Sequence, residues 1–256
     1  SFDLLTESCG SEFLRQTVAT IDASLQDGWP CWATSNHDVA RVASRWGDGI
    51  NDAARARVFL VFLLTLRGSV CLYQGEELGL DEANLDYAEL VDPYGIAFWP
   101  EYKGRDGCRT PMPWDGDQPH AGFSQARPWL PVSRTHLDKT VAVQDADPRS
   151  HLALCREFLA WRKEQPTLLK GDIRFHRSEP ETLCYERRLG DERLLVVLNL
   201  AATTKDWEPL RETGIALRAE AEYLRVNGAH WSPRRVRLAP FSAGFARIVP
   251  ASDTID

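Results

Sequence analysis

The sequence predicts an α/β fold followed by an all-β part. Two observations lead to this expectation. Near the N-terminus, stretches with helical spacing alternate with short apolar stretches, an order that is typical of a parallel sheet or barrel. Beyond Pro166 the apolar period changes to two, which is typical of antiparallel strands. We therefore place a domain boundary between residues 165 and 166.

The N-terminal part is predicted to run helix, strand, helix, strand. Residues 12–25 place their apolar side chains on one helical face, and residues 52–66 form a strongly apolar helix that Gly68 ends. Each helix is followed by a short apolar stretch, at 31–34 and at 69–73, with the length and composition of a buried strand.

A long loop-rich region at 79–147 separates these elements from the next helix. Connections of this length without clear elements are usually functional. Asp147 and Pro148 are typical of a helix N-terminus, and Pro166 closes the helix that they begin. Strands are predicted at 173–176, 183–188, 194–199, 236–238 and 244–249, with a hairpin turn at Gly190-Asp191.

Composition indicates a globular chain that binds neither nucleic acid nor membrane. Of the 256 residues, 43% are apolar and 26% charged, which excludes disorder. The net charge of −7 leaves no basic footprint for nucleic acid or anionic lipid, and no apolar run is long enough to span a bilayer. The six cysteines form no C-x-x-C pair. We expect a cytoplasmic protein without cofactor or metal.

Polar residues follow both short strands, where chemistry collects in a parallel barrel. The first strand leads to Asn36-His37-Asp38. An adjacent imidazole and carboxylate can hydrogen-bond a polyhydroxyl substrate and stabilise a developing positive charge. The alternative is a capping cluster on an ordinary strand–helix turn. The second strand leads to Glu76 and Glu77, and two acids on a loop are more often a solvated face than an acid/base pair.

Four ordered motifs resemble glycoside hydrolase family 13, and the resemblance covers essentially the whole chain. Asn36-His37-Asp38 with Arg41 resembles the end of barrel strand seven, residues 2–5 resemble the end of strand six, and residues 68–79 resemble the strand-eight segment. RDGCRTPMPWD at 105–115, followed by the stretches 121–124 and 128–132, resembles a loop of the oligo-1,6-glucosidase and α-glucosidase branch. In that branch the loop closes over the terminal glucose.

The resemblance implies both a fold and an activity. Residues 1–165 would be the C-terminal part of a catalytic (β/α)8 TIM barrel with an active-site loop at 79–147, and residues 166–256 an all-β sandwich domain. The implied activity is that of a retaining α-glucosidase, which hydrolyses or transfers terminal α-linked glucose through a glucosyl-enzyme ester. The implied substrate is a short oligosaccharide or another α-glucoside.

The same resemblance implies roles for single residues. Asp38 matches a third family acid, which binds the 2- and 3-hydroxyls of the glucose and stabilises the transition state. His37 and Asn36 are expected to bind the same sugar. Arg105 is expected to reach the non-reducing glucose, with Arg109 as its rival and an ion pair within the loop as the alternative.

Other residues are given supporting roles. Arg41 is expected to support Asp38 rather than to bind sugar. Trp99, Tyr102 and Trp114 are candidates for the substrate mouth, with core packing as the alternative for each. The acidic stretch 76–82 is interpreted as a solvated loop rather than a cation site, and no metal is expected.

Two parts of the family pattern do not occur in the sequence. They are the nucleophilic aspartate in its G-F-R-x-D motif and the acid/base glutamate. Only barrel strands seven and eight are found, whereas a complete barrel takes roughly 250 residues. We therefore expect the C-terminal half of an enzyme, inactive alone, whose partner is the missing N-terminal half of the barrel. The alternative is a non-catalytic glucosidase-like interaction module, although such relatives have lost active-site residues that are intact here.

Overall fold

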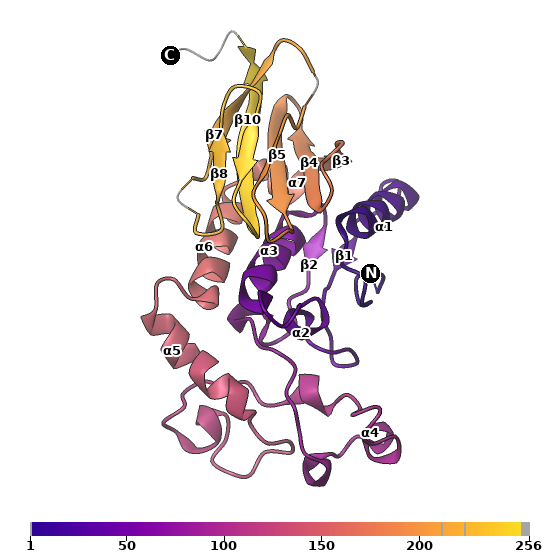
Figure 1. The fold of residues 1–256 in the computed structure, drawn as a ribbon, viewed down its shortest axis with the longest axis vertical. Coiled ribbons are helices and arrows are strands. Elements are labelled where there is room, and N and C mark those ends of the chain that lie inside the picture. The colour runs from indigo at the N-terminus through magenta and orange to yellow at the C-terminus, as the bar shows by residue number, and fades with distance from the viewer. Residues whose placement is uncertain (1, 211, 223, 252–256) are drawn as a thin grey trace. The chain divides into compact units, whose positions relative to one another are not determined.

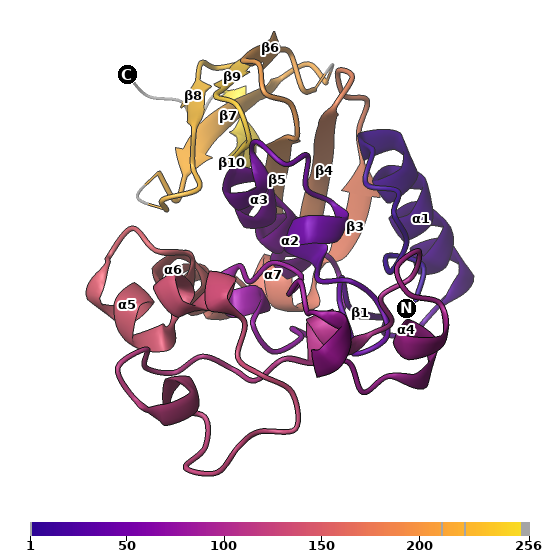
Figure 2. The ribbon, with the colours of Figure 1, turned by 60° about the horizontal axis from the view of Figure 1, so that its bottom comes forward.

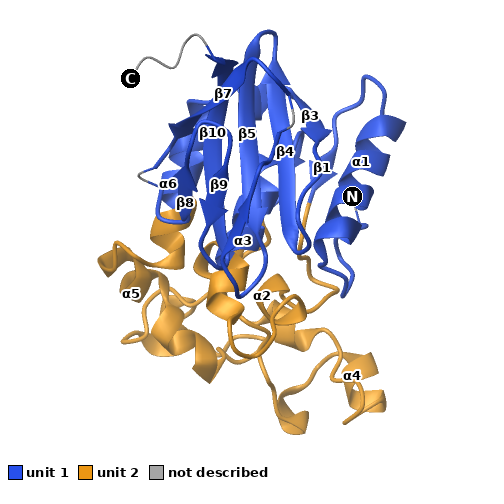
Figure 3. Ribbon diagram, turned by 45° about the horizontal axis from the view of Figure 1, so that its top comes forward, with its two compact units in different colours: residues 1–32, 57–71, 156–256 blue, residues 33–56, 72–155 orange. Residues whose placement is uncertain are grey.

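The computed structural model describes residues 2–210, 212–222 and 224–251, which form two compact units (Figure 3). One comprises residues 1–32, 57–71 and 156–256, and the other comprises residues 33–56 and 72–155. We call the first the sheet unit, because it holds every strand that the described residues form, and the second the loop unit.

The first elements follow the predicted order of helix, strand, helix, strand (Figure 1). α1 (Ser11–Ser24) precedes β1 (Cys31–Trp32), and α3 (Asp52–Thr65) precedes β2 (Ser69–Val70). A short helix that the sequence did not indicate, α2 (Val42–Arg45), lies between β1 and α3 in the chain. The predicted order is therefore confirmed.

β1 and β2 form a two-stranded parallel sheet, with Trp32 opposite Val70. Both strands are shorter than the apolar stretches that predicted them. Gly68 allows the chain to enter β2 close to the residue before β1. Its φ is +126°, and a Cβ atom there would lie 2.5 Å from the carbonyl oxygen of Pro30. Trp32 is fully buried, and its indole nitrogen donates to the carbonyl oxygen of Arg67 at 2.6 Å.

The next long helix, α6 (His151–Lys163), begins later than its sequence predicted. The prediction that Asp147 and Pro148 start the helix is wrong, because the Asp147 carboxylate accepts from the backbone N–H of Arg149 at 2.8 Å in a local turn. Ser150 caps the helix instead, since its Oγ accepts from the N–H of Ala153 at 3.0 Å. Pro166 then starts a further helix, α7 (Pro166–Lys170).

Two antiparallel sheets follow, and all five predicted strands are confirmed. The larger sheet has the order β3-β4-β5-β10-β7, formed by Asp172–Phe175, Thr182–Leu189, Glu192–Asn199, Ser242–Pro250 and Ile215–Glu220. The smaller has the order β6-β9-β8, formed by Lys205–Trp207, Val236–Leu238 and Ala229–Trp231. The predicted hairpin turn joins β4 to β5, and Gly190 adopts a φ of +59° in it.

The two sheets bury one apolar core between them. Figure 2 shows β8 and β9 alongside β7 and β10, and contacts between β10 and the two smaller strands agree with this view. The core takes Cys184, Leu195, Val197 and Ala246 from the larger sheet, and Trp207, Val236 and Leu238 from the smaller. Because every second residue of these strands points into this core, the period of two in the sequence reflects it.

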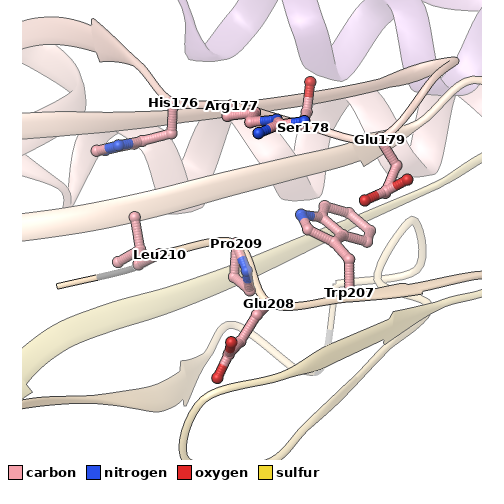
Figure 4. Close-up of a pocket in the computed structure, with 8 residues that line it drawn as sticks. All are labelled: His176, Arg177, Ser178, Glu179, Trp207, Glu208, Pro209 and Leu210. Atoms are coloured by element: carbon pink, nitrogen blue, oxygen red, sulfur yellow. The ribbon is translucent and has the colours of Figure 1, made fainter. Parts of the chain in front are cut away.

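A cavity of about 360 Å³ lies in the sheet unit between residues 176–179 and 207–210. Figure 4 shows Trp207 extending from one segment toward Glu179 on the other. Its wall mixes charged, aromatic and aliphatic side chains. Sequence reasoning gave no role to any of these residues.

The loop unit is built from short helical segments rather than from irregular chain alone. Besides α4 (Pro93–Ala97) and α5 (Val141–Ala146), its 3₁₀ segments are Glu76–Leu78, Tyr87–Glu89, Asp106–Arg109, Pro119–Gly122 and Arg134–Lys139. Across the described parts of both units, no helix has the length and apolarity needed to cross a membrane. The same residues contain no group of three or more His, Cys, Asp or Glu side chains placed to hold a metal.

Candidate active site

The stretch Asn36-His37-Asp38 follows β1 in the chain and forms a tight turn in the loop unit. Asn36 Oδ1 accepts from the backbone N–H of Asp38 at 2.8 Å and from that of Val39 at 3.2 Å. This is the capping arrangement that the sequence left open, and it fixes the backbone that carries Asp38. The side chains of His37 and Asp38 are 68% and 49% exposed, so both remain accessible.

Two arginines converge on one oxygen of Asp38. Arg105 Nη1 lies 3.3 Å from Asp38 Oδ1, and Arg109 Nη2 lies 3.1 Å from the same atom. The second oxygen, Oδ2, lies 3.5 Å from His37 Nε2. The carboxylate is therefore fixed on one side by cations, while its other side can accept hydrogen bonds from hydroxyl groups and stabilise nearby positive charge.

Arg105 is anchored on a buried carboxylate. Its Nε donates to Asp92 Oδ2 at 2.8 Å, and its Nη2 donates to Asp92 Oδ1 at 3.1 Å. Hydrogen bonds from Arg105 hold the pKa of Asp92 well below its usual range. The ion pair within the loop, which was the alternative for Arg105, is therefore present, and the same side chain also contacts Asp38. Its contact with the sugar stays a prediction.

Arg109 is held differently. Its Nε donates to the carbonyl oxygen of His37 at 2.7 Å while its Nη2 contacts Asp38. Arg109 therefore bonds both the backbone of the turn and the Asp38 carboxylate, but its Nε donates to a backbone carbonyl oxygen rather than to a buried carboxylate.

The prediction that Arg41 supports Asp38 is wrong. Arg41 is buried and donates from Nη1 to the carbonyl oxygen of Gln74 at 2.6 Å, with its guanidinium 5.5 Å from the ring centroid of Tyr73. Its backbone N–H donates to Glu82 Oε2 at 2.9 Å. Burial lowers the pKa of the Arg41 guanidinium. Arg41 thus fastens residues 74–82, and the two loop arginines support Asp38.

The interpretation of residues 76–82 as a solvated loop is also wrong. Glu76 is buried and accepts from Thr34 Oγ1 at 2.7 Å and from the N–H of Tyr73 at 2.7 Å. Burial raises the pKa of Glu76, and it also raises that of Glu82. These carboxylates point inward because they accept from donors on Thr34 and Tyr73, in the case of Glu76, and on the backbone of Arg41, in the case of Glu82.

The candidate aromatic side chains differ in environment. Trp99 packs against the buried cluster that Leu85, Leu90 and Leu130 help to form, so the core alternative holds for it. Tyr102 and Trp114 are 47% and 50% exposed. Only these two keep the accessible ring surface that contact with a sugar requires.

Sequence reasoning missed Asp92 and Asp106. Asp106 is fully buried, and its Oδ2 accepts from the backbone N–H of Val91 at 2.7 Å and from that of Asp92 at 2.8 Å. The pair Asp92-Pro93 carried a usable signal, because an aspartate before proline is typical of a helix N-terminus, and Asp92 does cap α4. No local pattern indicated that Asp106 would hold this segment.

Comparison with known proteins settles the family. The model for the α-amylase catalytic domain matches residues 3–171. The chain belongs to the α-amylase family, glycoside hydrolase family 13. The resemblance seen in the motifs is thereby confirmed. β1 and β2 lie within the matched residues, and the catalytic domain of this family is a barrel.

Members of the family that resemble this chain are named as α-glucosidases and glucosyl-transfer enzymes. A probable α-glucosidase of Rhizobium meliloti is 45% identical over 96% of this chain, and an oligo-1,6-glucosidase of Parageobacillus thermoglucosidasius is 31% identical over 75%. The crystal structure of the α-glucosyl transfer enzyme XgtA superposes with a TM-score of 0.89 at 42% identity over 96% of this chain. The chain spans 43%, 38% and 45% of these three proteins, respectively.

Proposed function

We propose that this chain supplies the sugar-binding and transition-state-stabilising residues of a retaining α-glucosidase. The reaction is the hydrolysis, or the transfer, of a terminal α-linked glucose from a short oligosaccharide. The Rhizobium and Parageobacillus relatives support the glucosidase assignment, and XgtA supports transfer as the second outcome.

The observation that carries this proposal is the environment of Asp38. Its Oδ1 is held by Arg105 and Arg109, and its Oδ2 lies beside the exposed imidazole of His37. In glycoside hydrolysis the sugar ring acquires positive charge, and hydrogen bonds to its 2-hydroxyl strengthen in the transition state. A fixed carboxylate with an accessible second oxygen can accept the hydroxyl hydrogen bonds and stabilise the positive charge, while His37 donates to a neighbouring hydroxyl. Asn36 contributes by holding the turn.

The nucleophile and the general acid are proposed to come from residues outside this sequence. β1 and β2 pair only with each other among the described residues, so each leaves one edge without a strand. Open parallel edges need further strands, and the remaining strands of the family barrel fill that need. In this proposal residues 1–165 complete the barrel, residues 79–147 cover its active site, and residues 166–256 form the β-sandwich C-domain. The chain alone is then inactive.

A non-catalytic interaction module is not favoured. The named relatives are glucosidases and glucosyl-transfer enzymes, and the histidine, aspartate and arginines of the site keep a mutually supporting geometry. A cytoplasmic location stays a prediction from cysteine usage.

Replacing Asp38 tests the proposal in the complete protein that carries this chain. With p-nitrophenyl α-D-glucopyranoside as substrate, Asp38→Asn is expected to lower kcat about 100- to 1,000-fold, because it removes the charge that stabilises the transition state. Asp48→Asn is the matched control, since Asp48 is a partly exposed loop aspartate that caps its own turn. Circular dichroism checks that both variants fold. Unchanged turnover in folded Asp38→Asn would refute the assignment.

A further inference from the structure

The Asp92 carboxylate receives more donors than a helix cap alone requires. Three of them belong to Arg105, whose backbone N–H and Nε each donate to Oδ2 at 2.8 Å, and whose Nη2 donates to Oδ1 at 3.1 Å. The fourth is the backbone N–H of Tyr94, at 3.2 Å from Oδ1. Capping accounts for the Tyr94 bond only. The other three fix the position and the orientation of one arginine.

The Asp92 side chain is itself immobilised. It is completely buried, and Asp106 Oδ2 accepts from the backbone N–H of Asp92 and from that of the preceding Val91. The segments at Gly95 and Gly104 pass so close to each other and to Asp92 that a side chain on Gly104 would not fit. A Cβ atom on Gly104, whose φ is +75°, would lie 2.9 Å from the Cα of Gly95 and 3.0 Å from Asp92 Oδ2. A buried, fully bonded carboxylate in a tightly packed segment is a rigid anchor.

This anchor uses only part of the guanidinium. Nε and Nη2 face Asp92, so Nη1 is the nitrogen left for another partner, and it lies 3.3 Å from Asp38 Oδ1. The ring of Tyr94 lies on the flank of the group, with its centroid 5.8 Å from the Arg105 Cζ. The orientation of Arg105 toward the exposed carboxylate is thus set by Asp92 and not by Asp38.

We propose that Asp92 is a positioning residue that acts through Arg105, fixing Nη1 against Asp38 and against the sugar hydroxyls bound there. The proposal rests on the proposed function, because it assigns Asp92 to that same site. Arg109 differs, since its Nε donates to the carbonyl oxygen of His37, and in the described structure no buried carboxylate accepts a hydrogen bond from it. Asp92 therefore makes Arg105 the more rigid of the two arginines that meet at Asp38.

The test is a double-mutant cycle in the complete protein, assayed with p-nitrophenyl α-D-glucopyranoside. Asp92→Asn leaves either Nε or Nη2 of Arg105 without an acceptor, because an amide offers one oxygen. We expect kcat/KM to fall about 100-fold, as for a catalytic group displaced by about 1 Å. Arg105→Gln is expected to cause a similar loss, and the double variant no further loss, because Asp92 acts through that side chain.

Asp86→Asn is the matched control. Asp86 caps another short helix of the same loop through a capping box with Glu89, but it holds no arginine in the described structure. Its replacement is expected to leave kcat/KM unchanged. If Asp92→Asn behaved like this control, or if its loss added fully to that of Arg105→Gln, the positioning role would be overturned.

Two further measurements keep the outcome decisive. If Asp92→Asn does not fold, Arg105→Lys replaces it, because one ammonium cannot hold Asp92 and reach Asp38 together. Full activity of Arg105→Lys would then overturn the proposal, and a loss equal to that of Arg105→Gln would support it. In the wild-type protein, slow exchange of the Arg105 Nε–H measured by NMR would show the anchor directly. Slow exchange in a protein that turns over no α-glucoside would mean that the proposed function had failed. Rapid exchange in an active enzyme would refute only the positioning role of Asp92.

Discussion

Arg187 on β4 donates from Nη1 to the carbonyl oxygen of Thr65, the last residue of α3, over 2.7 Å. The same guanidinium donates from Nη2 to the carbonyl oxygen of Gly171 at 2.7 Å and from Nε to that of Asp172 at 3.3 Å. Because Arg187 is fully buried, its pKa is lowered to about 10. A single side chain thus satisfies carbonyl groups at the end of α3 and at the start of β3.

Arg187→Leu is expected to destabilise the protein by about 2–4 kcal/mol, because the buried carbonyl groups of Thr65 and Gly171 and the partly buried one of Asp172 lose this donor. Chemical denaturation at neutral pH measures this change. Arg188→Leu is the control, since Arg188 is the exposed next residue of the same strand and donates to Gly190 O. It is expected to change the unfolding free energy by less than about 0.5 kcal/mol. Equal effects of the two changes would contradict the role given to Arg187.

Gly75→Ala is expected to disturb the packing around Arg41. Gly75 has a φ of +92°, and a Cβ atom there would lie 2.6 Å from Arg41 Nη1 and 2.7 Å from a methyl carbon of Leu80. Backbone strain alone costs about 1 kcal/mol at a left-handed position, and the clash adds to it. We expect a loss of about 2–4 kcal/mol in the unfolding free energy, measured by thermal or chemical denaturation.

Gly49→Ala separates these two causes. Gly49 also has a positive φ, +74°, but no atom lies within 4 Å of a Cβ built on it. Its replacement is expected to cost the strain alone, about 1 kcal/mol. A cost for Gly75→Ala no larger than that of Gly49→Ala would show that Arg41 and Leu80 move aside freely.

Sequence reasoning located the elements better than it located the contacts. Runs of apolar residues marked α3 and β5, because nearly all of residues 56–65 and all of residues 194–199 are buried. The turn at Asn36-His37-Asp38 was also recognisable, because its residues are adjacent in the sequence. The partners of Asp38 were not derivable from the sequence, because Arg105 lies 67 residues away and the family motif marked it only as a sugar contact.

The error over Arg41 has a related cause. Arg41 is three residues from Asp38, and closeness in sequence favoured a contact between them. A buried arginine instead goes where carbonyl oxygens and an aromatic face are available, and these are supplied by Gln74 and Tyr73. The sequence likewise did not predict that Glu76 points inward, because the donors that hold it lie on Thr34 and Tyr73.

Acid is expected to destabilise the sheet unit through Glu186. Burial opposes ionisation there, but hydrogen bonds from Arg193 and the imidazole of His176, 3.6 Å away, outweigh it and lower the pKa of Glu186 to about 2, from an ordinary value of 4.5. A carboxyl whose pKa is lowered by folding stabilises the fold above its unfolded pKa. This contribution is complete above about pH 4.5 and is lost as the pH falls toward 2.

Glu186→Gln tests this pH dependence. The variant is expected to be less stable than wild type at pH 7, and to lose less stability between pH 5 and pH 3, in denaturant titrations at each pH. Glu179→Gln provides the comparison, because Glu179 is an exposed carboxylate of the same unit. If Glu186→Gln lost as much stability as wild type over this interval, Glu186 would not be the group responsible.

Thiol reactivity tests whether the open strand edges are covered in the complete protein. Cys71 follows β2 directly and is exposed, whereas Cys108 is buried and has a pKa raised by burial to about 12. In this chain alone, 5,5′-dithiobis(2-nitrobenzoic acid) is expected to label Cys71 quickly and Cys108 hardly at all, because the thiolate is the reactive form. In the complete protein, the strands proposed to pair with β1 and β2 shield Cys71, so its labelling rate falls while that of Cys108 stays low. Cys71→Ser identifies the signal in both samples. Equal labelling of Cys71 with and without the rest of the protein would argue against a barrel completed at these edges.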